Sequence, residues 1–145
     1  MQQGPDSPEA LEAMIARYND AWNAHDVKLI MSMHAPGMVF ENHTAGERAE
    51  GEDVRGHIEG IFASWPDLRF QSVRIYAREG VVTQEWRAAA MHSRPVKRGD
   101  IEIAATGKAL SWDGVDVIPT ENGLIKRKDV YSDSVSILRQ LGFPG

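Results

Sequence analysis

Apolar side chains recur at helical spacing in the first half of the chain. Large apolar residues between positions 11 and 22 form one stripe, and Ser7-Pro8-Glu9 before it has the residue types of a helix start. A second stripe covers residues 54–65, although its two glycines weaken a helix intrinsically. Between the stripes, Asp26 can cap a short helix over residues 27–31. The first half therefore predicts three helices.

The second half alternates apolar and polar residues, which is typical of half-buried strands. The alternation changes parity near Gln71-Ser72, which predicts a β-bulge there. Glu121-Asn122-Gly123 predicts a hairpin turn, because Asn-Gly accepts positive φ. The whole pattern predicts strands at residues 38–42, 68–77, 81–92, 101–118 (interrupted near Thr106-Gly107-Lys108) and 124–131, a closing helix at 135–141, and loops at 43–51 and around Pro95 and Gly99.

Helices followed by a run of strands indicate the α+β class. The length of 145 residues suits one domain, which we expect to span residues 1–145. A strongly curved, mixed or antiparallel sheet wrapped around the N-terminal helices would form a cone. Such a cone would enclose an apolar pocket between sheet and helices.

Composition narrows the classes of partner. Acidic residues outnumber basic ones, 21 to 16, and the short basic runs at 94–98 and 126–128 look like solvated strand ends or loops, so we expect no nucleic acid partner. The absence of cysteine excludes disulfides and thiolate chemistry. No apolar stretch approaches a membrane span and no signal peptide is visible, so we expect a cytoplasmic protein without membrane contact. No motif indicates a metal or a cofactor, and we expect neither.

Asp116 is an acidic residue on an otherwise apolar strand face. It shares parity with Leu110, Trp112 and Gly114. Burying a carboxylate is costly unless it is protonated or hydrogen-bonded. Either this face lines the pocket and Asp116 is a functional group, or it is the outer face and Asp116 meets water or a salt bridge; we favour the pocket.

The other candidate site residues are suggested only by the residues that share a helix or strand face with them. Tyr18 belongs to the first helical stripe and could equally be a core tyrosine. Asn42 shares parity with Phe40, so both face the pocket unless Asn42 simply ends the strand in a turn. Trp86 and Ala88 share one strand face, where small residues beside a tryptophan suit a ligand cavity or a close helix contact equally.

Several fragments in fixed order resemble a known family. They are Arg17-Tyr18 through Ala21-Trp22-Asn23-Ala24-His25-Asp26, Ala35-Pro36-Gly37-Met38-Val39-Phe40, Trp65-Pro66-Asp67-Leu68, Val82 through Trp86, Asn122-Gly123-Leu124-Ile125 through Tyr131-Ser132-Asp133, and Leu138-Arg139-Gln140-Leu141-Gly142. Together they resemble the SnoaL-like branch of the nuclear transport factor 2-like superfamily, which includes polyketide cyclases, limonene epoxide hydrolase and ketosteroid isomerase. The resemblance implies a cystatin-like α+β barrel, but fold alone does not fix function.

The resemblance to ketosteroid isomerase implies half of a catalytic site. Tyr18 falls on its oxyanion-binding tyrosine and Asp116 on its oxyanion-binding aspartic acid, a carboxyl group held neutral. The general-base aspartate falls on Asn42, which cannot take a proton; Asn42 also matches a water-holding asparagine of the epoxide hydrolase. The resemblance therefore implies both hydrogen-bond donors to the oxyanion, but no general base.

The epoxide hydrolase template fits poorly elsewhere. The aspartate that this enzyme shares with the cyclases falls on Val130, and Asp129 beside it would face the other side of the sheet. Its arginine and aspartate fall on Trp86 and Ala88, and its tyrosine on Phe40. Epoxide hydrolysis by the family mechanism is therefore rejected.

We expect an enzyme without cofactor that acts on a small hydrophobic molecule with a carbonyl group, by isomerisation, cyclisation or hydration. The alternatives are a non-catalytic binding protein with the same pocket and an interaction scaffold. The expected site comprises Asp116, Tyr18 and Asn42 as catalytic residues, with Trp22, Phe40, Trp86, Ala88, Trp112 and Val130 contacting the substrate. Asp116 and Tyr18 are expected to form a hydrogen-bonding pair or a shared donor site. The partly apolar outer parity of the strands predicts a homodimer through the outer sheet face.

Overall fold

The computed structural model describes residues 4–98 and 100–143. Its elements are, in chain order, α1 (Pro8–Asn23), α2 (Val27–Ser32), β1 (His34–Asn42), β2 (Glu47–Glu50), α3 (Asp53–Ser64), β3 (Arg69–Arg78), β4 (Val81–Met91), β5 (Val96–Arg98), β6 (Ile101–Ile103), β7 (Ala109–Glu121), β8 (Leu124–Ser132) and α4 (Ser134–Gln140). Six strands form one sheet in the order β2-β1-β8-β7-β4-β3, and β5 pairs with β6 in a separate hairpin.

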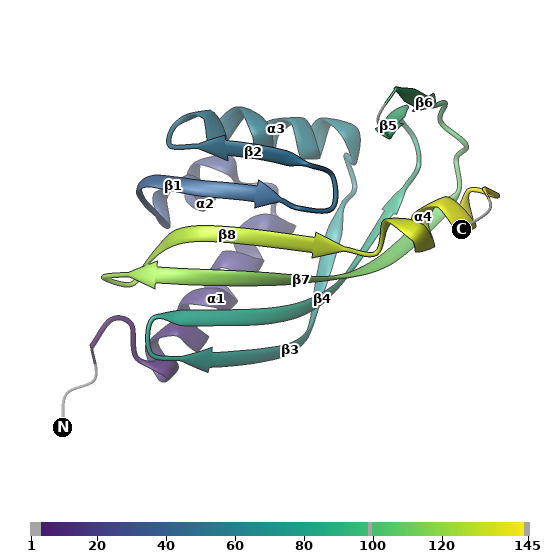
Figure 1. The fold of residues 1–145 in the computed structure, drawn as a ribbon. Coiled ribbons are helices and arrows are strands. Elements are labelled where there is room, and N and C mark those ends of the chain that lie inside the picture. Colours follow the sequence, from purple (N-terminus) through teal and green to yellow (C-terminus); the bar gives the residue numbers. More distant parts are fainter. Residues whose placement is uncertain (1–3, 99, 144–145) are drawn as a thin grey trace.

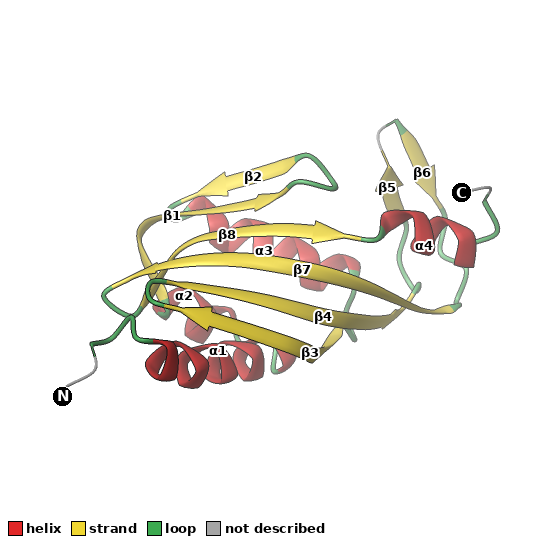
Figure 2. Ribbon diagram, turned by 60° about the horizontal axis from the view of Figure 1, so that its bottom comes forward, coloured by secondary structure: helices red, strands yellow, loops and turns green. Residues whose placement is uncertain are grey.

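The six-stranded sheet is curved and open, and its two faces differ. Helices α1, α2 and α3 cover one face, whereas no described helix covers the other (Figure 1). The turned view shows the long strands β7 and β4 bending over α1 (Figure 2). All neighbouring strands of this sheet run antiparallel except β1 and β8, which are parallel. The predicted α+β class with a curved mixed sheet is confirmed, although the sheet does not close into a barrel.

The helix starts follow the sequence signals. The Ser7 hydroxyl accepts a hydrogen bond from the Ala10 amide at 3.2 Å, and Pro8 occupies the first helical position. The Asp26 carboxylate accepts one from the Leu29 amide at 3.1 Å and caps α2. These side chains satisfy backbone N–H groups that a helix start otherwise leaves unpaired.

The alternation in β4 and β7 divides the residues between an inner and an outer face. The inner residues are buried against the helices, and the outer ones are exposed or half-buried. The inner set is Val82, Gln84, Trp86, Ala88 and Ala90 on β4, and Leu110, Trp112, Gly114, Asp116 and Ile118 on β7. The predicted parity of both strands is therefore correct, and Asp116 lies on the helix side.

Several predicted boundaries are wrong. β1 begins at His34 rather than Met38, because its parallel pairing with β8 starts there and Gly37 (φ +73°) accommodates an irregular register. The segment 43–51 is not entirely a loop, since β2 pairs with the end of β1. Short polar edge strands bury little apolar surface, so they leave little periodic signal.

The region around residues 95–118 also differs from the prediction. The expected loop around Pro95 contains β5, while Gly99 lies outside the described residues. The long interrupted strand is in fact two strands, β6 and β7, that belong to different sheets. The bulge in β3 falls between Ser72 and Arg74, next to the predicted place. In the described part of the chain, no helix is long and apolar enough to span a membrane.

Candidate functional site

A cavity of about 630 Å³ lies between the inner face of the sheet and the helices α1 and α3. This volume is within the range of small-molecule sites, roughly 300–1,000 Å³. Six large aromatic residues contribute to its wall beside polar and charged ones: Trp22, Phe40, Trp65, Phe70, Trp86 and Trp112. Lining residues from the β1–β2 turn and from the β5–β6 hairpin are exposed, so the cavity opens to solvent there.

A carboxyl group and an amine face each other inside this cavity. Asp116 on β7 is 3% exposed and Lys128 on β8 is 6% exposed. The Nζ of Lys128 lies 3.7 Å from Oδ2 of Asp116. Both residues line the cavity, and strand parity directs both of them inward. The site therefore holds a buried pair of ionisable groups that a ligand in the cavity could reach.

Aromatic rings surround the amine of Lys128. Its Nζ lies 4.1 Å from the centroid of the Trp22 ring, 4.9 Å from that of Tyr18 and 5.3 Å from that of Phe40. Aromatic faces attract a cation but cannot replace the hydrogen bonds of water. The amine is thus held in a largely apolar cage with one carboxyl partner.

Burial moves both members of the pair toward their neutral forms. Burial raises the pKa of Asp116, and the nearby charge of Lys128 opposes this shift. Burial lowers the pKa of Lys128, and the charge of Asp116 opposes that shift. Each group opposes the shift that burial causes in the other, so the protonation of the two groups is coupled.

Tyr18 does not form the predicted hydrogen bond with Asp116. Its hydroxyl lies 2.9 Å from Nε2 of His34, and Oδ1 of Asp116 has no hydrogen-bond partner among the described residues. Tyr18 is almost completely buried and is not among the lining residues, and burial raises its pKa. The predicted pair is wrong, because helix α1 directs the phenol toward β1. Tyr18 instead contributes its ring to the cage around Lys128.

Asn42 lines the cavity but also serves a turn. Its Oδ1 accepts a hydrogen bond from the amide of Ala45 at 3.0 Å. This is the alternative that the sequence left open, a strand-ending asparagine. The predicted contact residues Trp22, Phe40, Trp86, Trp112 and Val130 all line the cavity. Ala88 is fully buried on the same strand face as Trp86 but is not a lining residue.

His57 is a lining residue that sequence reasoning missed. It lies on α3 with its ring centroid 4.8 Å from that of Phe40, edge to face. Its Nε2 is buried without a hydrogen-bond partner in the described chain, and burial lowers its pKa, which favours the neutral ring. The available signal was helical spacing, since Ile61 and Ser64 follow His57 on the same stripe and also line the cavity.

Lys128 was missed because the run 126–128 was interpreted as solvated. That interpretation holds for Lys126, which is exposed, but is wrong for Lys128. The available signal was parity, because Lys128 shares a strand face with Val130, which the family resemblance placed in the pocket.

Four buried polar atoms of lining residues have no hydrogen-bond partner among the described residues. They are Nε1 of Trp22, Nε1 of Trp86, Nε2 of His57 and Oδ1 of Asp116. Buried polar atoms are usually paired, and an unpaired one costs about 1–3 kcal/mol. The residues around the cavity therefore carry buried polar atoms whose hydrogen-bonding capacity is unused within the described chain.

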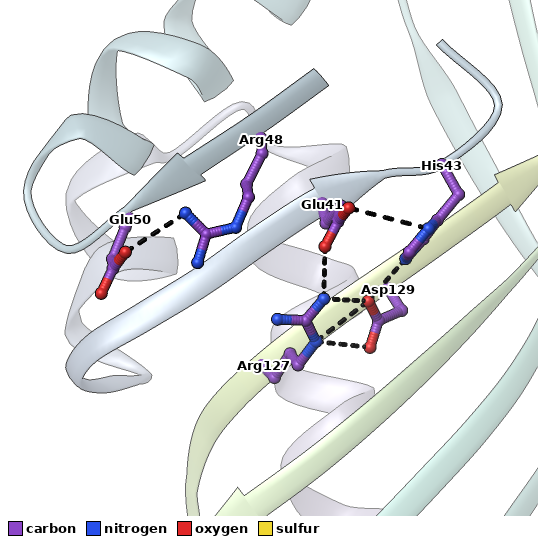
Figure 3. A network of polar contacts seen from close by, with 6 residues as sticks. All are labelled: Glu41, His43, Arg48, Glu50, Arg127 and Asp129. Carbon is purple, nitrogen blue, oxygen red and sulfur yellow. Dashed lines mark hydrogen bonds and ion pairs between the residues drawn. The ribbon is translucent and has the colours of Figure 1, made fainter. Parts of the chain in front are cut away.

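A separate polar network lies on the outer face of the sheet (Figure 3). Arg127 pairs with Glu41 and with Asp129, and His43 Nε2 lies 2.7 Å from Oδ1 of Asp129. Asp129, the acid next to Val130, is thus held away from the cavity. Donor atoms of Glu41, His43 and Asp129 lie within 4.8 Å of one another, but Arg127 already pairs with both carboxylates.

Comparison with known proteins points to one family and one fold. A family model described as SnoaL-like domain matches residues 15–128. No match was found among curated protein sequences.

Three solved structures illustrate the shared fold. AclR, a candidate hydroxylase from Streptomyces galilaeus, has 21% identity and a TM-score of 0.81, covering 96% of this chain and 89% of its own. IdmH, a candidate polyketide cyclase from Streptomyces antibioticus, has 21% identity and a TM-score of 0.77, covering 91% and 98%. A SnoaL-like candidate cyclase from Jannaschia sp. CCS1 has 13% identity and a TM-score of 0.81, covering 100% and 99%. At these identities the likeness shows the fold alone.

Proposed function

Because the chain belongs to the SnoaL-like domain family, we propose that it is a cofactor-independent enzyme performing acid–base chemistry on a small hydrophobic carbonyl compound. The observation that carries this proposal is the buried pair of Asp116 and Lys128 inside an aromatic cavity. A buried ion pair adds little net stability to a fold, because the cost of desolvating both groups offsets their attraction. A pair that faces a cavity can instead exchange protons with a ligand.

The polar pair would hold the carbonyl oxygen of the substrate. A protonated Asp116 or a charged Lys128 donates to that oxygen and stabilises the negative charge that develops on it. Trp22 and Trp86, each with an indole N–H group, belong to the same wall. The aromatic rings around Lys128 limit its contact with water, which strengthens these interactions.

His57 is the base that the family positions lack. A neutral imidazole with an unpaired Nε2 can take a proton from the carbon next to the carbonyl. Asn42 lies near the opening, where it can orient the substrate. Isomerisation, cyclisation and hydration all require such proton transfer at a polarised carbon. The expected wall residues Phe40, Trp112 and Val130 complete the contact surface.

A non-catalytic binding protein is the second candidate. Asn42 cannot replace the aspartate base of ketosteroid isomerase, and its side-chain oxygen is occupied by the Ala45 amide. The cavity would then hold a ligand without converting it. Turnover separates the two functions, because both predict binding.

The test uses 2-naphthol as an enolate mimic and 2-tetralone as a ketone. Quenching of tryptophan fluorescence reports binding of either probe. Exchange of the α-hydrogens of 2-tetralone in D2O, followed by mass spectrometry, reports proton abstraction. An enzyme exchanges deuterium faster than buffer does, and His57→Gln reduces exchange while retaining binding. Asp116→Asn should weaken binding of 2-naphthol as well. Binding without exchange for a series of ketones would favour the binding protein instead.

A further inference from the structure

We propose that Lys128 is a nucleophile that forms a Schiff base with aldehydes and unhindered ketones in the cavity. This inference rests on the proposed function, because it requires that the cavity admit carbonyl compounds. It narrows the substrate class, since esters, amides and carboxylic acids do not form Schiff bases with an amine. It also assigns a covalent step to a residue that the family positions do not include.

The first support is the geometry of the amine. Nζ of Lys128 lines the cavity, and its nearest acidic oxygen, on Asp116, is 3.7 Å away. That separation is longer than a hydrogen bond, for which nitrogen and oxygen approach to about 2.7–3.2 Å. The two groups are close enough to interact as an ion pair, yet Nζ also borders the cavity, where it can approach a ligand.

The second support is the apolar cage. The rings of Trp22, Tyr18 and Phe40 surround Nζ without accepting its protons as water would. A desolvated lysine favours the neutral amine, which is the nucleophilic form. The lowered pKa of Lys128 agrees with this environment. Lys126, two residues away on the same strand, is exposed and lacks such a cage.

The third support is that a proton donor and acceptor stands beside the amine. The lone pair of Nζ attacks the carbonyl carbon, and the electron pair of the C=O bond moves to the oxygen. Asp116 passes a proton from nitrogen to that oxygen, which gives a carbinolamine. Asp116 then protonates the hydroxyl, which leaves as water while the nitrogen lone pair forms the C=N bond. The protonated Schiff base remains beside the Asp116 carboxylate, so charge and atoms balance.

The hydrogens on the carbon next to a protonated Schiff base would be more acidic than the hydrogens next to the free carbonyl group. The positive nitrogen withdraws electrons, and a base can then remove a hydrogen from that carbon. His57 and the pair of Tyr18 with His34 are the other titratable groups near Lys128, from α3, α1 and β1. Of these, His57 lines the cavity and has an unpaired nitrogen.

The experiment traps the Schiff base by reduction. The protein is incubated with 2-naphthaldehyde and sodium cyanoborohydride, and intact mass and peptide maps locate the naphthylmethyl group. We expect one adduct, on the peptide that contains Lys128. Lys128→Arg should abolish it because guanidinium forms no Schiff base, and Asp116→Asn should slow it. Lys126→Arg, the matched control on the same strand, should leave it unchanged.

The outcomes separate this proposal from the proposed function. If the aldehyde quenches tryptophan fluorescence but labels exposed lysines alone, the Schiff base is disproved and acid–base catalysis stands. Labelling that persists in folded Lys128→Arg would also disprove the Schiff base at Lys128 and leave acid–base catalysis standing. If a series of aromatic aldehydes and ketones neither quenches nor labels, the carbonyl-binding function fails together with the Schiff base. Circular dichroism of each variant establishes that it is folded.

Discussion

The indole ring of Trp86 rests against the backbone of Gly114, its cross-strand partner in the β4–β7 pair. A Cβ atom on Gly114 would lie 2.2 Å from a carbon of that ring, far inside contact distance. Only glycine lets the ring lie this close to β7. This close approach helps to keep the cavity beside Trp86 open.

Gly114→Ala should therefore shrink the cavity. The added methyl group must push the Trp86 ring away from β7, and such overpacking typically costs about 1–3 kcal/mol. We expect a lower unfolding free energy in urea and weaker quenching by 2-naphthol. Gly4→Ala, which lies before α1, is the control, because its Cβ would meet no atom within 4 Å and Gly4 does not line the cavity. Equal stability and binding of Gly114→Ala and the parent would contradict the role of this glycine.

Breaking the buried pair should harm the fold more than removing it. Asp116→Leu leaves a buried amine without its partner, for which we expect a loss of about 3–5 kcal/mol in the free energy of unfolding. Adding Lys128→Met should recover most of the lost stability, since a pair of apolar side chains needs no solvation. The matched control is Arg87→Met with Asp113→Leu, a pair on the exposed face, where solvent screens the attraction and its loss should change stability little. A double variant at Asp116 and Lys128 as unstable as the single one would show that the coupling is absent.

Acid should destabilise the fold through His34, whose pKa burial lowers from 6.5 to about 4. The unfolded chain takes up a proton here below about pH 6.5, but the folded chain does so only near pH 4. Stability is therefore lost as the pH falls through this interval, by up to about 3 kcal/mol from this group. His34→Gln should reduce the loss seen in urea unfolding at a series of pH values. Tyr18→Phe keeps the imidazole, so the acid loss should persist in that variant.

We expect a homodimer through the outer sheet face. This face carries exposed Tyr76, Met91 and Tyr131 beside half-buried Val115 and Val117, while no described helix covers it. Exposed apolar side chains on an uncovered sheet face favour association, and the ion pairs on the same face would form the polar surroundings of the interface. Sedimentation should show a dimer at micromolar concentration, and charged residues placed in the patch should favour the monomer.

The variant pair Tyr76→Glu with Met91→Lys tests this face. Ile101→Lys is the control, because Ile101 is exposed on the β5–β6 hairpin rather than on the sheet. A parent protein that sediments as a monomer, or a dimer unaffected by the paired substitutions, would rule out this interface.

The sequence predicted the elements whose burial is regular. β4 and β7 alternate over their length because one face meets the helices and the other does not, so Asp116 and Trp86 could be placed before the structure was known. β2 and β5 escaped prediction because they are four and three residues long and largely polar, whereas β6 was predicted as the first part of one interrupted strand with β7. β2 pairs with the neighbouring β1 and β5 with the neighbouring β6, in short hairpins that leave too few residues for a periodic pattern.

The chemical partners within the site were harder to predict. Lys128 lies in a basic run, and lysine is almost never buried unless it is paired. Its burial depends on rings from two other elements, α1 and β1, and on a carboxyl group from a third, β7. Tyr18 bonds to His34 instead of Asp116 because the tilt of a helix against a sheet decides which side chains meet. The residue pattern carries no information on that tilt.

The β5–β6 hairpin belongs to a sheet of its own, yet it contributes Val96 and Glu102 to the cavity wall. The reactive pair sits on β7 and β8, in the middle of the main sheet. Under the proposed function, the hairpin and the β1–β2 turn border the opening, whereas the groups that would react lie on the main sheet. Exchanging the hairpin for one of another length or polarity should change which compounds enter, while the groups that react with them stay in place.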